Sequence, residues 1–132
     1  MLTNQVIQKT IQDIKRVSGY EISLWGADGE SVASSASESE ILKDKVKSFI
    51  EDSEMEDISE RADEETALFA IYADRALEYV MALTGTGDDR MLAGRMGVIQ
   101  VVGLMKACGE QMDKDRFIQN LLLDNLFVVV EM

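Results

Sequence analysis

Residues 20–35 most constrain the fold, because they have the pattern of two β-strands joined by a tight turn. Apolar and polar residues alternate along residues 20–25, which is the period of a strand with one buried face. The turn carries Asp28 and Gly29, and an Asp-Gly pair is among the strongest short-range signals for a hairpin. With a return strand at residues 30–34, the segment predicts an antiparallel hairpin around which a sheet is built.

Helices are predicted on both sides of this hairpin. After it, Ser37 and Glu40 have the spacing of a capping box, which begins a helix that runs to about Asp52. The acidic stretch 51–65 has few apolar residues to bury, so we expect a loop there with at most a short turn. Before the hairpin, a helix over residues 3–18 ends at Gly19 and has one face at helical spacing, formed by Val6, Ile7, Thr10, Ile11, Ile14 and Val17.

Two more strands are predicted at residues 66–73 and 78–84, with a turn at residues 74–77 between them. Both segments are apolar, and the first has a β-branched or aromatic residue at four of its eight positions. Their lengths also permit short buried helices, so that alternative stays open. As a second hairpin they join the first in one antiparallel sheet.

A long helix is predicted over residues 88–111, and a further helical segment over residues 112–132. Gly94 and Gly97 share a face of the first helix, where each costs about 1 kcal/mol relative to alanine. Their presence indicates that the sheet or a second subunit packs closely there. A heptad-like seam then either mediates dimerisation or packs on its own domain; it consists of Met105, Cys108, Met112, Ile118, Leu121, Asn125 and Val128.

This order of elements predicts an α+β fold. We expect a PAS/GAF-like antiparallel sheet of four or five strands, with helices packed on one side and long N- and C-terminal helices. The prediction is a single domain over residues 1–132, with a sheet and helix core at 20–87 and C-terminal helices at 88–130. The apolar C-terminal run FVVVEM indicates a fragment of a longer protein.

Charge and residue usage exclude several function classes. The formal charge is −12, and so acidic a surface repels phosphates, so we expect no nucleic-acid binding by this chain itself. There is no histidine and one cysteine, which removes the commonest general base and the usual zinc ligands. We therefore expect no catalytic residue, no metal and no cofactor. The GTGDD turn at residues 85–89 either caps the following helix or contributes to an anion site.

The sequence also bears on location. No uninterrupted apolar stretch approaches the ~20 residues of a membrane-spanning helix, and the N-terminus has no signal-peptide pattern. We expect a cytoplasmic protein that does not enter a membrane.

Four segments carry a resemblance to a known family: NQVIQKTIQDI, YEISLWGADGESVASS, EYVMALTGTGDD and RFIQNLLLDNL. With them the chain resembles, over essentially its whole length, the N-terminal sugar-diacid-recognition domain of the bacterial sugar diacid regulator family of transcription regulators. The resemblance implies a PAS/GAF-like sensor of small carboxylic acids such as glycerate, glucarate or galactarate. It also implies a regulatory segment and a helix-turn-helix domain further along the full protein.

Two segments depart from the family pattern, and both are expected to border the ligand pocket. Residues 64–76 lack the Asn and Pro of a Gly-x-Asn-x-Pro element, and residues 36–46 lack a histidine. A carboxylate site needs hydroxyl, amide or cationic donors around a concave surface. By position we predict ligand contacts from Ser34, Ser35 and Ser37 at the end of the second strand, and from Arg75 and Arg95; the alternative is that each arginine is a surface charge.

Two functions follow from these features. In the first, a small carboxylate binds beside the sheet and shifts the terminal helices, which reposition a DNA-binding domain absent from this chain. In the second, the chain is a ligand-independent dimerisation module of a regulator. A homodimer through the terminal helices is expected in both.

Overall fold

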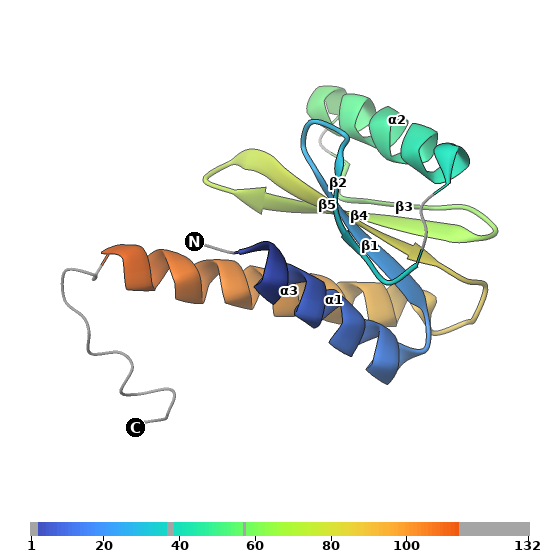
Figure 1. Cartoon of the computed structure of the whole chain (residues 1–132). Helices are drawn as coiled ribbons and strands as arrows, with labels where there is room; N and C mark the ends of the chain where they lie inside the picture. Colours follow the sequence, from blue (N-terminus) through green and yellow to red (C-terminus); the bar gives the residue numbers. More distant parts are fainter. Residues whose placement is uncertain (1–2, 37–38, 57, 114–132) are drawn as a thin grey trace. The chain divides into compact units, whose positions relative to one another are not determined.

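The computed structural model describes residues 3–36, 39–56 and 58–113 (Figure 1). The chain divides into two compact units, residues 3–101 and residues 102–132 together with 1–2. In chain order the elements are α1 (Asn4–Ser18), β1 (Glu21–Gly26), β2 (Ser31–Ser34), α2 (Glu40–Glu56), β3 (Glu60–Ala62), β4 (Thr66–Ala73), β5 (Ala76–Thr84) and α3 (Arg90–Asp113).

The strands form one five-stranded sheet in the order β2-β1-β5-β4-β3, and every neighbouring pair is antiparallel. This confirms the α+β class, the hairpin at residues 20–35 and the second hairpin. The turn between β4 and β5 is tighter than predicted, because only Asp74 and Arg75 separate the strands. Both have positive φ angles, 53° and 70°, as a two-residue type I′ hairpin turn requires.

Strand β3 lies in the acidic stretch predicted to be a loop, so that prediction was wrong. Its three residues pair with β4, with Glu60 opposite Phe69 and Arg61 opposite Leu68. The stretch has no apolar alternation because β3 is a short edge strand held by backbone hydrogen bonds. Helix α2 also extends into this stretch, to Glu56 instead of Asp52.

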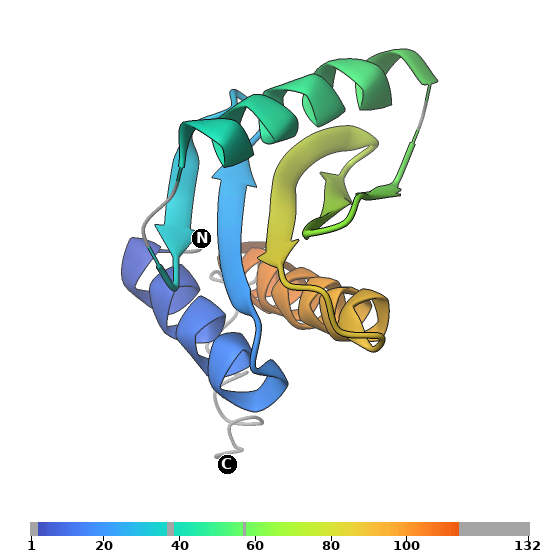
Figure 2. The ribbon, with the colours of Figure 1, turned by 90° about the vertical axis from the view of Figure 1, so that its right-hand side faces the viewer.

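Helices cover both faces of the sheet, which corrects the prediction that they pack on one side (Figure 2). On one face, α2 buries a core cluster made of Trp25, Val46, Phe49, Ile50, Leu68, Val80 and Ala82. On the other face lie α1 and the part of α3 up to Val101 (Figures 1 and 2). The central strands alternate between two apolar layers, since Met81 and Phe69 point away from α2 and are nearly inaccessible.

Gly94 and Gly97 are the points where α3 approaches the sheet. A Cβ atom added to Gly94 would lie 2.2 Å from two ring carbons of Phe69, and one added to Gly97 would lie 2.9 Å from the sulfur of Met81. The predicted close packing is therefore confirmed, and its partner is the sheet.

The helix ends agree in part with the predicted signals. Gly19 adopts the left-handed conformation that ends α1, as expected. Helix α2 is capped by Ser39, whose Oγ accepts a hydrogen bond from the Leu42 amide at 3.1 Å, so the capping box predicted at Ser37 was wrong. Ser37 itself lies outside the described residues.

Helix α3 begins after the GTGDD turn. The Asp89 carbonyl accepts the first helical hydrogen bond, from Ala93 at 2.9 Å, while the Asp89 carboxylate accepts a hydrogen bond from the Tyr20 hydroxyl. Asp89 thus stands at the N-cap position, but its side chain connects the helix to the beginning of β1. Of the predicted heptad seam, only the Met105 and Cys108 side chains lie within the described part of the chain.

One segment of the described chain, Arg90–Cys108 within α3, has the length and apolar composition of a membrane-crossing helix. The sequence prediction missed it because arginines and glycines interrupt its apolar runs. Length and composition are weak signals, since the core helix of a water-soluble domain has them too. In this chain Gly94, Gly97 and Val101 are buried, but most of the segment is not.

Candidate ligand-binding site

The structure does not gather the predicted ligand contacts into one site. Ser34 is the last residue of β2, one edge strand of the sheet, and Ser35 follows it, whereas Arg95 bonds to Glu60 of β3, the opposite edge. Five strands at about 4.8 Å spacing put roughly 19 Å between those edges. Arg75 lies in the turn between β4 and β5. Ser37 falls outside the described residues.

The two described serines bind within the fold. The Ser35 hydroxyl donates to Glu21 Oε1 at 2.7 Å and accepts from the Ile22 amide at 2.9 Å. This hydrogen bond from Ser35, together with the Lys15 ammonium, lowers the pKa of the Glu21 carboxyl below its ordinary value. The Ser34 backbone exchanges two hydrogen bonds with the Gln8 amide, at 2.8 and 3.3 Å. These contacts fasten β2 to β1 and α1.

A cleft lined by two cations and two carboxylates lies between α2 and the β3–β4 hairpin. Its volume is about 330 Å³, near the lower end for small-molecule sites. Residues of both segments that depart from the family pattern line it. Its lining comprises Asp44, Lys45, Ser48, Arg61, Ala62, Asp63, Thr66 and Leu68.

Strand pairing explains how Arg61 reaches this cleft. Residues opposite each other in an antiparallel pair point to the same face, so Arg61 shares the α2 face with Leu68. Its Nη2 is 2.6 Å from Asp52 Oδ2, and its guanidinium lies 5.5 Å from the ring centre of Phe49. The ion pair and the cation–π contact together hold the guanidinium in one orientation at the cleft wall.

Lys45 brings a second cation from α2. Its Nζ lies 2.9 Å from Asp63 Oδ2 and donates to Thr66 Oγ1 at 3.1 Å. The hydrogen bond from Lys45, with those from the backbone amides of Glu65 and Thr66, holds the pKa of the Asp63 carboxyl below its ordinary value. Asp63 therefore stays ionised and keeps Lys45 at the mouth of the cleft.

The β3–β4 turn beside the cleft is fastened to the beginning of α3. Arg90, the first residue of the helix, donates through its guanidinium to the carbonyl oxygens of Asp63 and of Gly85, the latter at 3.2 Å. The Gly85 amide donates to the Glu65 carbonyl at 2.9 Å. A change in the position of this turn therefore acts directly on α3.

Arg95 makes a second connection between β3 and α3. Its Nε and Nη2 donate to the two carboxylate oxygens of Glu60, each at 2.8 Å. This bidentate pair lowers the pKa of Glu60 and raises that of Arg95. Because Glu60 and Arg61 are adjacent in β3, the strand has one side chain at α3 and the next at the cleft.

Sequence reasoning missed Lys45 and Arg61 as site residues. The departing segments indicated the area around Lys45, but only the α2–β4 packing places it beside Thr66. Arg61 is a lone cation in an acidic stretch. The face of the sheet on which its side chain lies follows from its place in β3, a strand that the sequence did not reveal.

Within the described part of the chain, no group of three or more Cys, Asp or Glu side chains could hold a metal ion. No protein-family model matches this chain, and no curated protein sequence matches it either. The geometry of the site therefore carries the functional argument.

Proposed function

We propose that this chain is a ligand-sensing regulatory domain of a bacterial transcription regulator, with a PAS/GAF-like form of the α+β fold. Its ligand is a small carboxylic acid bound in the cleft between α2 and β3–β4. The single observation that carries the proposal is the meeting of Lys45 and Arg61 at one cleft. Residues 19–89 contain 19 acidic and only five basic residues, and two of those five line this cleft.

The two cations supply the donors that a carboxylate needs. A guanidinium binds a carboxylate through two parallel N–H donors, and an ammonium adds a point charge. Ser48 and Thr66 lie on the same lining and offer hydroxyls to the polar groups of a sugar acid. The cleft thus suits a short, hydroxylated acid.

The ligand displaces two carboxylates of the protein. Asp52 and Asp63 hold the cations in the free chain, and the side chains of both pairs are about a third to a half exposed. Ion pairs that exposed contribute about 0–1 kcal/mol each, so breaking them costs little. The contacts of a ligand carboxylate with the same two cations replace these pairs, and hydroxyl contacts to Ser48 and Thr66 add to them.

The signal passes to α3 through the same residues. When a ligand takes the Lys45 ammonium, the Asp63 carboxylate keeps only its hydrogen bonds from the Glu65 and Thr66 amides, and the Asp63 carbonyl is one that Arg90 binds. The ligand then binds more tightly when the β3–β4 turn has a different position relative to α3. A sensor requires such a difference in affinity between two conformations. Helix α3 leads toward a DNA-binding domain encoded outside this chain. The same proposal makes the chain a cytoplasmic non-enzyme that does not bind DNA itself.

A thermal-shift screen tests this function. The panel contains glycerate, glycolate, tartrate, glucarate and galactarate, with neutral sugars as controls. A ligand of the folded state raises the melting temperature as its concentration passes the dissociation constant. We expect a saturable rise for one class of acid, and its absence with every acid at millimolar concentration would contradict the proposal.

Two pairs of variants locate the site. Arg61→Gln and Lys45→Gln are each expected to weaken binding more than tenfold, because each removes a charge-assisted contact of about 1.5–3 kcal/mol. Lys43→Gln is the matched control, because Lys43 is also in α2, pairs with Glu30 at 3.6 Å and is similarly exposed. Arg95→Gln is the second control and should leave affinity unchanged, contrary to the prediction from sequence position. Equal losses in all four variants would show that charge alone, and not this cleft, governs binding.

A further inference from the structure

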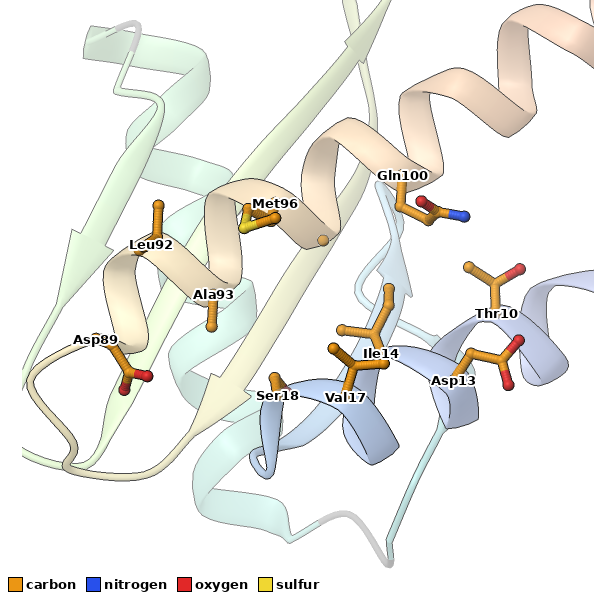
Figure 3. A pocket seen from close by; sticks show the side chains of 11 residues that line it. Thr10, Asp13, Ile14, Val17, Ser18, Asp89, Leu92, Ala93, Met96 and Gln100 are labelled. Carbon is orange, nitrogen blue, oxygen red and sulfur yellow. The ribbon is translucent and has the colours of Figure 1, made fainter.

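A second hollow lies between α1 and α3, on the sheet face opposite the proposed ligand cleft. It is a groove of about 400 Å³ whose lining is mainly apolar, including Ile14, Val17, Ala93, Met96 and Gly97. Figure 3 shows Ile14 and Val17 of α1 and Ala93 of α3 directed into the space between the helices. The sensing function proposed above leaves this groove without a role.

A ridge of apolar side chains runs along α3 at the edge of the groove, and two of its members, Leu92 and Met96, also line the groove. Leu92, Met96 and Ile99 follow one another at intervals of four and three residues and are 60%, 61% and 70% exposed. A surface helix ordinarily has charged residues opposite its buried face. Here Gly94, Gly97 and Val101 are buried, yet the opposite side is apolar as well.

From this groove and ridge we infer that the α1–α3 face docks a second copy of the chain, as a two-fold symmetric dimer. In an isologous contact each molecule supplies the same patch, so that patch must be complementary to itself. The α1–α3 face meets this condition because it carries both a groove and a neighbouring ridge. The ridge of one copy fills the groove of the other, and four helices meet at the interface.

The charge distribution favours the same occupant. Residues 19–89, which include α2, hold 19 of the 25 acidic residues, so two copies repel each other through that part of the surface. Along α1 and the part of α3 up to Val101, most charges are locally compensated, and the Asp89 carboxylate, which lines the groove, accepts a hydrogen bond from the Tyr20 hydroxyl. Asp13 binds both Lys9 and Arg16, Lys15 binds Glu21, and Arg95 binds Glu60.

These charges disfavour a membrane as the occupant. Helices that lie on anionic membranes combine their apolar face with lysines and arginines available to lipid headgroups. The cations of α1 already pair with carboxylates, and the chain as a whole has a formal charge of −12. The inference does not depend on the proposed ligand, because the groove and the cleft lie on opposite faces of the sheet.

Sedimentation equilibrium of the full chain tests the inference. We expect a mass twice the monomer's 14.7 kDa at high protein concentration. The double variant Leu92→Glu with Met96→Glu should sediment as a monomer, because it places charges in the centre of a desolvated contact. A monomeric wild-type chain at every concentration would overturn the inference, as would a double variant that still dimerises.

The matched control is a double variant on the opposite helix. Ile41 and Met55 in α2 are 69% and 83% exposed, so Ile41→Glu with Met55→Glu adds the same charge to equally exposed apolar positions. This control should remain dimeric. Loss of the dimer in both double variants would attribute the effect to net charge and overturn the assignment to α1–α3.

Two additional measurements keep the outcome interpretable. If the glutamate double variant loses its fold, the double variant Leu92→Gln with Met96→Gln takes its place, because it adds no charge. It should weaken the dimer more than about tenfold. Flotation of the wild-type chain with vesicles of mixed neutral and anionic lipid should show no binding. A different result would be a wild-type chain that is monomeric and binds vesicles, with a glutamate double variant that does not bind them. That result would show that the α1–α3 face docks on a membrane and not on a second copy.

Discussion

Replacing Gly94 by alanine should destabilise the protein, although alanine is the better helix former. In an exposed helix interior this change stabilises by about 1 kcal/mol. Here the new Cβ would lie 2.2 Å from Cε1 and Cζ of Phe69, more than 1 Å inside the 3.4 Å at which ordinary contact begins. The ring is 1% exposed and has core neighbours on the sheet, so it cannot move into solvent.

The steric cost exceeds the gain in helix propensity. Overpacking a well-filled core costs about 1–3 kcal/mol, and a contact this short belongs in the upper part of that range. Subtracting the helix gain leaves a net loss of about 1–2 kcal/mol. For a chain of this length, each kcal/mol corresponds to a shift of about 3–5 °C in melting temperature.

Gly103→Ala is the internal control in the same helix. Among the described residues, nothing except its chain neighbours and the backbone of its own helix lies within 4 Å of the position of its added Cβ, so alanine should stabilise by up to about 1 kcal/mol. Thermal and urea unfolding of the two variants should therefore give shifts of opposite sign. A Gly94→Ala variant as stable as the wild type, or more stable, would refute the close packing of α3 on β4.

Three further predictions concern individual charges. Asp63→Asn should strengthen acid binding several-fold in a calorimetric titration, because the competitor for Lys45 is removed; weaker binding would show that Asp63 helps to hold the ligand. The carboxyl pKa values of Asp63 and Glu60 are lower in the folded chain than in the unfolded chain, so their stabilising contribution is complete above about pH 5 and is lost as pH falls through the folded values. The free energy of unfolding, measured from pH 7 to 3, should show this loss. In the double variant Glu60→Gln with Asp63→Asn it should fall less steeply with decreasing pH, and an unchanged slope would contradict this prediction. The pKa of the Tyr20 phenol is raised mainly by its hydrogen bond to the Asp89 carboxylate, so an ultraviolet titration of Asp89→Asn should show that phenol ionising at lower pH than in the wild type.

Local signals predicted most of the elements. The Asp28-Gly29 turn and the Gly19 stop act over a few residues, and the structure has both of them. The alternation at residues 20–25 located β1, but its four central residues are all buried, so the inference of one buried face was wrong. The capping residue of α2 was misplaced by two positions, because several serines in that loop fit the pattern equally well. Strand β3 was missed because only its register with β4 makes its three residues a strand.

The two-layer core had a signal that the prediction did not use. Residues 66–73 read TALFAIYA, a nearly continuous apolar run, and such a run indicates a strand buried on both faces. That observation would have placed helices on both sides of the sheet. The candidate site had no comparable signal, since it depends on strand order. The order β2-β1-β5-β4-β3 separates Ser34 from Arg95 and brings Lys45 of α2 to Thr66 of β4.

The most direct test of the proposed ligand site is an amide-resolved NMR titration of the chain with the acid that gives the largest thermal shift. We predict that saturable changes cluster at Lys45, Arg61 and Thr66 and extend to Arg90 at the beginning of α3. Changes confined to the end of β2 around Ser34, or no saturable change at the α2–β3–β4 cleft, would contradict the proposed site and its connection to α3.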